Sequence, residues 1–249
     1  VTQRDSERQV VCPEKTCRSK PPPSPHFSHP PLGFLRKGIR LCGVLYFGHM
    51  EKVRLRLDKV PRALLPTRFG EFEIFGFENE VDREQAVAVV KGRLEKDLVP
   101  LVRIHSQCFT GDTLHSLRCD CGEQLEKALA RIEASGRGLL IYQMQEGRGI
   151  GLLNKLYAYE LQDRGVDTVE ANVKLGFGAD QRSYAFCAQI LKYFDIAVIR
   201  LMSNNPAKIQ GLEAEGIRVV ERVPLVIRGS HLSEKYLKTK KEKLGHLLD

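Results

Sequence analysis

Short runs of apolar residues recur along the second part of the chain, and these runs predict β-strands. Runs of β-branched and aromatic side chains that are bounded by polar residues or glycine are typical of strands. From Met50 onward such runs occur at Phe72–Phe77, Val99–Ile104, Leu139–Gln143, Val198–Met202 and Ile217–Val220.

Helical spacing fills the intervals between the predicted strands. Apolar residues three or four positions apart share one face of a helix, as Leu125, Leu129 and Ile132 do before Gly136. A later helix has Asn205 as its expected N-cap, with Pro206 in its first position. The helices are predicted at Glu123–Ser135, Leu152–Arg164, Ser183–Tyr193 and Pro206–Glu215. This alternation predicts a mixed α/β protein, while the order of its strands is not readable from the pattern.

The first 49 residues carry no lasting apolar period. Seven of the twelve prolines fall in this segment, a composition typical of disorder. The chain begins with valine and its first methionine is Met50, so we interpret residues 1–49 as an over-extended translation start, with a flexible basic arm as the alternative. A folded domain is then expected at 50–228 and a basic tail at 229–249.

The formal net charge of +8 raises the question of a nucleic-acid partner. Residues 1–49 hold eight Lys and Arg against three Asp and Glu, which leaves a net charge of only +3 for residues 50–249. The folded part is nearly balanced, and this argues against nucleic acid. A nucleic-acid-binding protein with structural zinc remains a rival interpretation, although few aromatic residues interleave with the lysines at 235, 238, 240, 241 and 243.

Hydropathy and the number of cysteines indicate where in the cell the protein is expected to work. No apolar stretch approaches the roughly 20 residues that span a bilayer, and the first residues lack the order of a secretory signal. We therefore predict no membrane partner and a cytoplasmic location. The seven cysteines are odd in number and three of them lie within fourteen residues, which is a poor layout for disulfides and a good one for a metal.

The spacing Cys108-x10-Cys119-x-Cys121 predicts a zinc site, because thiolates select zinc. Structural sites usually take four protein ligands, whereas catalytic sites take three and leave a position for a water whose pKa falls to about 7. Spacing alone leaves both uses open, since other residues could complete a structural site. These candidates are His105, His115, Cys42 and Cys187.

Two glycine-containing segments carry further candidate residues. Gln145–Gly151 lies between a predicted strand and a predicted helix, where backbone N–H groups favour phosphate and Arg148 could fork onto its oxygens. A tight turn with an exposed arginine explains these residues equally well, because neither a dinucleotide fingerprint nor a Walker loop is matched. In Gly178–Arg182, Asp180 and Arg182 form a pattern that is more often an ordinary surface ion pair.

Taken together, these segments resemble GTP cyclohydrolase II of riboflavin biosynthesis. Similarity runs from about Leu65 to the ending Tyr236–Lys240 and Gly245–Leu247. The matching motifs are RIHSQC at 103–108, TGD at 110–112, SLRCDCGEQL at 116–125, QEGRGIG at 145–151, LNK at 153–155, AYELQD at 158–163, DTVEAN at 167–172, SNNP at 203–206 and VERVP at 220–224. The resemblance implies a mixed sheet flanked by helices, and hydrolysis of GTP to a diaminopyrimidinone carrying phosphoribosylamine, formate and pyrophosphate.

The resemblance also implies roles for the ambiguous residues. One zinc ion per subunit would be held by Cys108, Cys119 and Cys121, and its open position would activate a water that attacks C8 of guanine and releases formate. Tyr159 would act as a hydrogen-bonding or acid–base group near the opening ring.

The same resemblance implies that Arg182 acts on the α-phosphorus, through a covalent guanylyl intermediate that expels pyrophosphate. A guanidinium stays protonated and is a poor nucleophile. Asp180, as the neighbouring proton acceptor, is what makes the step tolerable.

GTP, with magnesium on its triphosphate, is by the same carry-over bound by residues from several motifs. These are Arg103, Ile104, His105, Ser106, Gln107, Gln124, Glu146, Gly147, Arg148, Thr168, Ser203 and Lys208. The family works as a homodimer. Many relatives are fused to an upstream dihydroxybutanone phosphate synthase domain, but about a hundred residues precede Cys108, so we predict a single-function enzyme.

Four positions depart from the residues usual in the family. Met144 removes a cation and Gln107 removes an anion, so the two changes partly offset each other in local charge and bear on affinity more than on chemistry. Ser183, where Asp is usual, could loosen the Asp180/Arg182 loop and leaves room for a paralogue that processes GTP only partly. Ser203 keeps the hydroxyl of the usual threonine.

Overall fold

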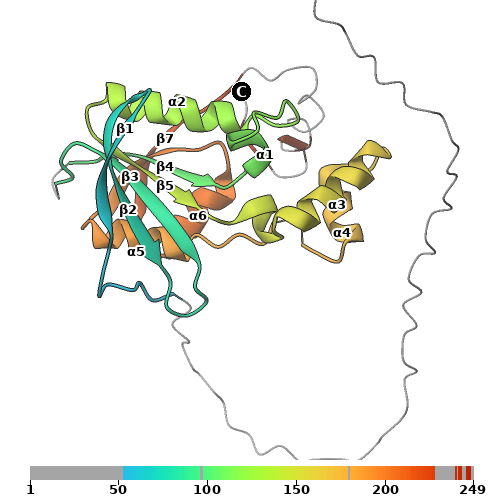
Figure 1. Ribbon diagram of the computed structural model, residues 1–249, viewed down its shortest axis with the longest axis horizontal. Helices are drawn as coiled ribbons and strands as arrows, with labels where there is room; N and C mark the ends of the chain where they lie inside the picture. Colours follow the sequence, from blue (N-terminus) through green and yellow to red (C-terminus); the bar gives the residue numbers. More distant parts are fainter. Residues whose placement is uncertain are drawn as a thin grey trace, which may run out of the picture. The chain divides into compact units, whose positions relative to one another are not determined.

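The computed structural model describes residues 53–95, 98–178, 180–227, 239, 241–242 and 245–247. Within these residues the chain forms a seven-stranded sheet with helices on both faces (Figure 1). The strands are β1 Arg62–Thr67, β2 Gly70–Glu78, β3 Gln85–Lys91, β4 Leu101–Ser106, β5 Gly138–Gln143, β6 Val198–Met202 and β7 Arg218–Val223. The helices are α1 Phe109–Asp112, α2 Cys121–Ala134, the 3-10 turn η1 Glu146–Gly149, α3 Leu152–Asp163, α4 Thr168–Lys174, α5 Ala185–Tyr193 and α6 Pro206–Ala214.

The sheet is mixed and has the strand order β1-β2-β3-β5-β4-β6-β7. β1, β2, β3 and β5 pair antiparallel, whereas β5, β4, β6 and β7 pair parallel. β4 and β5 are central and almost continuously buried, as parallel strands covered on both faces must be. The predicted mixed α/β fold, with a mixed sheet flanked by helices, is confirmed.

The alternation of side chains along β4 decides which of its residues face the candidate active site described below. Successive side chains of a strand point to opposite faces, and Val102 and Ile104 join the core cluster that contains α5 and α6 residues. Leu101 packs with residues of α2 on the other face. Arg103 and His105, two and four positions after Leu101, therefore face the α2 side of the sheet.

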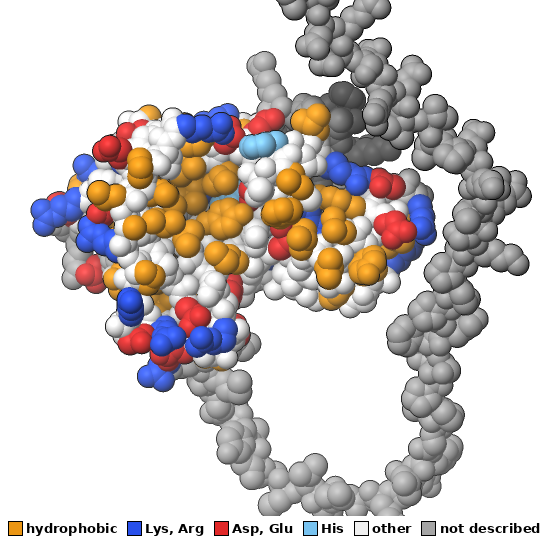
Figure 2. All heavy atoms as spheres, viewed as in Figure 1, with side chains coloured by type: hydrophobic (Ala, Val, Ile, Leu, Met, Phe, Trp, Pro, Cys, Tyr) orange, Lys and Arg blue, Asp and Glu red, His pale blue; other side chains and the backbone are white. Residues whose placement is uncertain are grey.

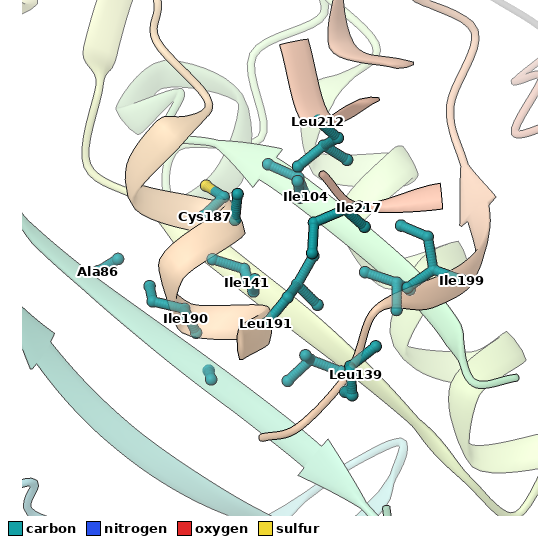
Figure 3. Packing of buried hydrophobic residues seen from close by; sticks show 14 of the residues in the cluster. Ala86, Ile104, Leu139, Ile141, Cys187, Ile190, Leu191, Ile199, Leu212 and Ile217 are labelled. Carbon is teal, nitrogen blue, oxygen red and sulfur yellow. The ribbon is translucent and has the colours of Figure 1, made fainter. Parts of the chain in front are cut away.

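The larger core cluster closes the opposite face (Figure 3). Ile190 and Leu191 of α5 and Leu212 of α6 are completely buried together with Ile104 and Ile141 of the central strands. Burying one such side chain contributes about 1.5–3 kcal/mol, so this face anchors the strands whose ends carry the site.

All five predicted strands and all four predicted helices are present among the described residues, with ends shifted by at most three positions. The predicted cap is confirmed, because the Asn205 side chain accepts the N–H of Ala207 at 3.0 Å. β1, β3 and α4 were not predicted. β3 carries Ala86 and Ala88, poor strand formers, and both are buried in the core cluster.

The predictions for residues 1–49, and for most of 229–249, fall outside the described residues and stay predictions. Across the part of the chain that is described, no helix combines the length and the apolar character needed to cross a bilayer.

Candidate active site

The candidate site lies beyond the ends of the parallel strands β4, β5 and β6. Ligands of open α/β sheets bind outside the carboxyl ends of the strands, where the connecting loops converge. Here β4 leads into the loop with Cys108, β5 leads into η1, and β6 leads into Ser203–Asn205. One pocket collects side chains from these three loops and from α2 and α3. The sheet thus unites motifs that lie far apart in the sequence.

Three thiols meet in this pocket. The Sγ atoms of Cys108, Cys119 and Cys121 all lie within 4.8 Å of one another, and those of Cys108 and Cys119 are 3.7 Å apart. Two sulfurs bound to one tetrahedral zinc at about 2.3 Å lie about 3.8 Å apart. The spacing therefore fits a single zinc ion.

Two of the candidates for a fourth ligand, His105 and Cys187, are engaged elsewhere, whereas Cys42 lies outside the described residues. Nε2 of His105 lies 3.0 Å from Oδ1 of Asp112, and Cys187 is buried in the core cluster. Among the described residues, the group able to hold a metal consists of the three cysteines alone. Three ligands that leave one position open are the arrangement of a catalytic zinc.

Gly111 is packed among the three cysteines. A Cβ added at this position would lie 2.8 Å from Sγ of Cys119 and 3.1 Å from Sγ of Cys108. Van der Waals contact requires a larger separation, so the lack of a side chain is what lets α1 approach the start of α2.

Gly111→Ala is expected to weaken zinc binding by about 10- to 100-fold, the cost typical of disturbing the shell around a metal. The added methyl group would push the thiols apart. Competition with a chromogenic chelator measures the affinity, and Gly178→Ala is the matched control because, within the described part of the chain, its added Cβ meets only Cγ of Gln181 at 3.9 Å. Wild-type affinity in Gly111→Ala would contradict this account of the packing.

Buried carboxylates fix the backbone at Cys108. The N–H of Cys108 donates to Oδ2 of Asp112 at 2.9 Å, and the hydroxyl of Tyr142 donates to the same oxygen at 2.8 Å. The N–H of Phe109 donates to Oε2 of Glu146 at 2.6 Å. Outer partners of this kind orient a metal ligand before the metal arrives.

The three thiols do not share their protons equally. Hydrogen bonds from Cys119 and Cys121, reinforced by the Lys155 ammonium, lower the pKa of Cys108 far below that of a free thiol, although burial opposes them. The pKa of Cys119 is raised to about 11, chiefly because its thiol is hydrogen-bonded to Cys108. The lowered pKa of Cys108 favours its thiolate, which is the form that binds a metal.

The loop after β5 places an arginine in the pocket wall. Gly147 and Arg148 both have φ of 62°, and a residue with a side chain adopts this region at a cost that recurs at functional sites. Both terminal nitrogens of Arg148 are buried and find no hydrogen-bond partner within the described part of the chain. A phosphate group would supply acceptors for this fork, and the alternative of an exposed arginine on a simple turn does not hold.

Asp180 and Arg182 form an oriented pair with limited exposure. Their side chains are 27% and 13% exposed, and Nε of Arg182 donates to Oδ1 of Asp180 at 2.9 Å while Nη2 donates to Oδ2. Burial raises the pKa of Asp180, but the hydrogen bonds and the charge of Arg182 outweigh it and the net shift is downward. The N–H of Gln181 donates to the carbonyl of Arg148 at 3.0 Å, which ties this loop to the preceding one.

Two more cations are buried at the pocket. Arg103 donates to Oε1 of Gln124 at 2.6 Å, and Nζ of Lys208 donates to the carbonyl of Ile104 at 2.7 Å. Burial lowers the pKa of Arg103 to about 10, and burial together with repulsion from Arg103 and Arg182 lowers that of Lys208. A polyanion would relieve this repulsion, so the pocket favours a strongly anionic ligand.

Most sequence-predicted site residues line this one pocket. They are Arg103, His105, Ser106, Gln107, Cys108, Cys119, Cys121, Gln124, Glu146, Gly147, Arg148, Tyr159, Thr168, Arg182, Ser203 and Lys208. Ile104 does not line it, because its side chain is completely buried in the core. Asp180 joins the site through its pair with Arg182 rather than as a lining residue.

Sequence reasoning missed eight of the lining residues: Ile150, Lys155, Ala158, Gln162, Asn172, Asn204, Asn205 and His246. Lys155 and Asn172 lie within the quoted motifs and are 9% and 3% exposed, so their place in a matching motif was the signal that could have found them. His246 belongs to the segment 229–249, which was expected to be a basic tail. The N–H of its neighbour Leu247 donates to the carbonyl of Asn204 at 2.8 Å, which brings this part of the tail to the pocket.

The four residues that depart from the family pattern have different surroundings in the structure. Gln107 and Ser203 line the pocket, whereas Met144 does not and is 43% exposed. The backbone of Ser183 is held on both sides, since its N–H donates to Oε1 of Gln145 at 3.2 Å and its carbonyl accepts Nε2 of Gln143 at 2.6 Å. These bonds oppose the loosening of the Asp180/Arg182 loop that the serine alone suggested.

Comparisons with known proteins agree with this geometry. The sequence profile of the family described as GTP cyclohydrolase II matches residues 58–224. The GTP cyclohydrolase-2 of Buchnera aphidicola subsp. Schizaphis graminum is 53% identical over 194 residues, which are 78% of this chain and 99% of that protein. The GTP cyclohydrolase-2 of Actinobacillus succinogenes is 51% identical over 193 residues, 78% of this chain and 89% of that protein. The riboflavin biosynthesis protein RibBA of Chlorobium phaeovibrioides is 55% identical over 212 residues, 85% of this chain but 52% of that longer protein.

Proposed function

Since this chain belongs to the GTP cyclohydrolase II family, we infer that it is the enzyme that hydrolyses GTP in the first step of riboflavin biosynthesis. The products are the diaminopyrimidinone that carries phosphoribosylamine, formate and pyrophosphate. The observation that carries this inference is a single pocket that joins a group of three thiols to Arg148, Arg182 and Lys208.

We propose that the three thiols hold zinc, whose chemistry is to polarise the substrate and to lower the pKa of a bound water. Tyr159 lies beside them, with its hydroxyl 3.3 Å from Oγ1 of Thr110. Burial raises the pKa of Tyr159, so the phenol keeps its proton at neutral pH and can donate a hydrogen bond to the opening ring.

At the other part of the pocket, we propose that Arg148 and Lys208 bind the triphosphate, accompanied by magnesium. Arg182 attacks the α-phosphorus while the bond from that phosphorus to the bridging oxygen of pyrophosphate breaks. The proton lost from the guanidinium passes to Asp180, which the hydrogen bonds between the two side chains already orient. The charge that depresses the pKa of Asp180 disappears in the same step, so its basicity rises when it is needed.

We propose that the rest of the GTP molecule is bound by polar residues that lie around the thiol group and around the triphosphate-binding residues. It comprises Arg103, His105, Ser106, Gln107, Gln124, Glu146, Gly147, Thr168 and Ser203, with Ile104 contributing through its backbone. Guanine and ribose present several donors and acceptors, and a pocket with this many polar side chains can satisfy them.

We further propose a homodimer in the cytoplasm, without nucleic-acid partners. Leu153, Leu156, Tyr157 and Val173 on α3 and α4 are exposed, Leu153 at 71%, and Figure 2 shows apolar side chains gathered over this part of the molecule. An apolar patch of this kind is typical of an association surface. Sedimentation velocity distinguishes the expected dimer from a monomer.

The test of the function is one incubation of purified protein with GTP, zinc and magnesium, in which formate, pyrophosphate and the absorbance of the pyrimidine are followed together. Equal amounts of all three are expected. Pyrophosphate without formate would identify a paralogue that processes GTP only partly. No product from a zinc-loaded protein would favour the nucleic-acid-binding rival, which salt-dependent retention of RNA or DNA would then support.

A further inference from the structure

Lys155 is a buried cation at the centre of the polar contacts around the thiols. Its Nζ lies 2.7 Å from Oε1 of Glu146, 3.0 Å from Oγ1 of Thr110 and 3.2 Å from Sγ of Cys108. The side chain is 11% exposed. An ammonium group has three donors and no acceptor, so these three partners saturate it.

The charge of this lysine is matched to its surroundings. The carboxylate of Glu146 and the sulfur of Cys108, which both become negatively charged when they lose a proton, lie within hydrogen-bond distance of its Nζ. A buried ammonium without such partners would be strongly unfavourable. Lys155 therefore keeps its charge next to Cys108, where three thiolates would otherwise give a divalent ion a net negative site.

Glu146 extends the arrangement to the backbone of the metal loop. One carboxylate oxygen accepts Lys155, and the other accepts the N–H of Phe109 directly after Cys108 at 2.6 Å. Its side chain is 7% exposed. Both oxygens thus accept hydrogen bonds from this part of the protein, so Glu146 holds the metal loop in place in addition to lining the pocket proposed for GTP.

Thr110 extends the arrangement in the opposite direction, to Tyr159. Its Oγ1 contacts Nζ of Lys155 at 3.0 Å and the hydroxyl of Tyr159 at 3.3 Å. Lys155 and Tyr159 are one helical turn apart on α3, and Nζ of Lys155 lies 5.6 Å from the centre of the Tyr159 ring. The same lysine thus touches a thiol of the metal group and the hydroxyl that orients the tyrosine.

We propose that Lys155 is a positioning residue that joins the thiol group to Tyr159: it supplies the counter-charge of Cys108 and, through Thr110, fixes the direction of the Tyr159 hydroxyl. The role rests on the proposed function, since it presumes that the thiols bind zinc and that Tyr159 acts on the ring. Formate release should then depend on Lys155 more strongly than GTP binding does.

The first test is made without substrate, on Lys155→Met, Lys155→Arg and the control Lys174→Met, which removes an exposed lysine paired with Glu170 on α4. Zinc affinity in chelator competition is expected to fall about 10- to 100-fold in Lys155→Met, to recover largely in Lys155→Arg, and to stay unchanged in Lys174→Met. After replacement of zinc by cobalt, the thiolate-to-metal charge-transfer band should shift in Lys155→Met only. Unchanged affinity together with an unshifted band would overturn the proposal.

The second test separates the link to Tyr159 from the counter-charge. Thr110→Val keeps the size of the side chain and removes its hydroxyl, so zinc affinity should remain while kcat for formate release falls about 10-fold and KM for GTP does not change. Combined with Tyr159→Phe, the two losses should be non-additive. Additive losses would overturn the proposed link to Tyr159, and this part of the proposal is tested even if Lys155→Met does not fold.

The two tests also separate this proposal from the proposed function. Failure of the wild-type protein to bind zinc would contradict the function itself. A wild-type protein that binds zinc and releases formate, with Lys155→Met equal to it in affinity, band position and kcat, would contradict the role of Lys155 alone.

Discussion

Cys119→Ser is expected to abolish formate release. The substitution removes one of three sulfurs that lie within 4.8 Å of one another, and a hydroxyl is a poor replacement for a thiolate as a zinc ligand. Loss of the ion removes several kcal/mol of stabilisation from the transition state of ring opening. The rate should therefore fall by at least about 1000-fold.

The measurement is formate release per protein, with zinc content determined on the same sample. Cys187→Ala is the matched control, since it removes a thiol that belongs to the core cluster and not to the metal group. It should retain zinc and formate release. If Cys119→Ser kept both its zinc and its ring-opening activity, the assignment of the metal ligands would be wrong.

Arg182→Ala is expected to suppress pyrophosphate release while zinc remains bound. Nε and Nη2 of Arg182 donate to the carboxylate of Asp180, and Nη1 donates to Oγ of Ser106 at 3.3 Å. This geometry directs the guanidinium to one place in the pocket. Arginines that act on a reacting phosphoryl group contribute about 1000- to 100,000-fold to the rate, and we expect a loss in that range.

The comparison that isolates the role of Arg182 uses Arg182→Lys and Asp180→Asn. Arg182→Lys keeps the charge but not the fork, so it should bind GTP and still release little pyrophosphate. Asp180→Asn keeps the shape and removes the proton acceptor, and should impair the same step. Pyrophosphate release at the wild-type rate in Arg182→Ala would exclude Arg182 from the chemistry.

The sequence alone was sufficient for the elements whose own pattern is strong. β5 and β6 are apolar runs between polar residues, and α2 has a clear apolar face, so burial and local geometry agree at these places. The metal group was predictable for a similar reason, because three cysteines within fourteen residues can meet without help from distant parts of the chain.

Weak local signals hid other elements. β3 carries Ala86 and Ala88, whose β-propensity is low, and only the packing of the core cluster above them makes that strand favourable. α4 has seven residues, which is too short for a helical period to be distinguished.

Tertiary structure alone decided how the separate motifs form one site. The strand order β5-β4-β6 places the loops of Arg148, Cys108 and Ser203 beside one another, and no local periodicity encodes that order. Strand alternation also divides a continuous motif, since Arg103 lines the pocket while Ile104 is buried in the core. Lys155 shows the same limit: its sequence position predicts a helix, but its charge is explained only by Cys108 and Glu146, which the fold brings to it from two other segments. Contacts between distant residues follow from the burial of the whole core, and so they appear only once the chain has folded.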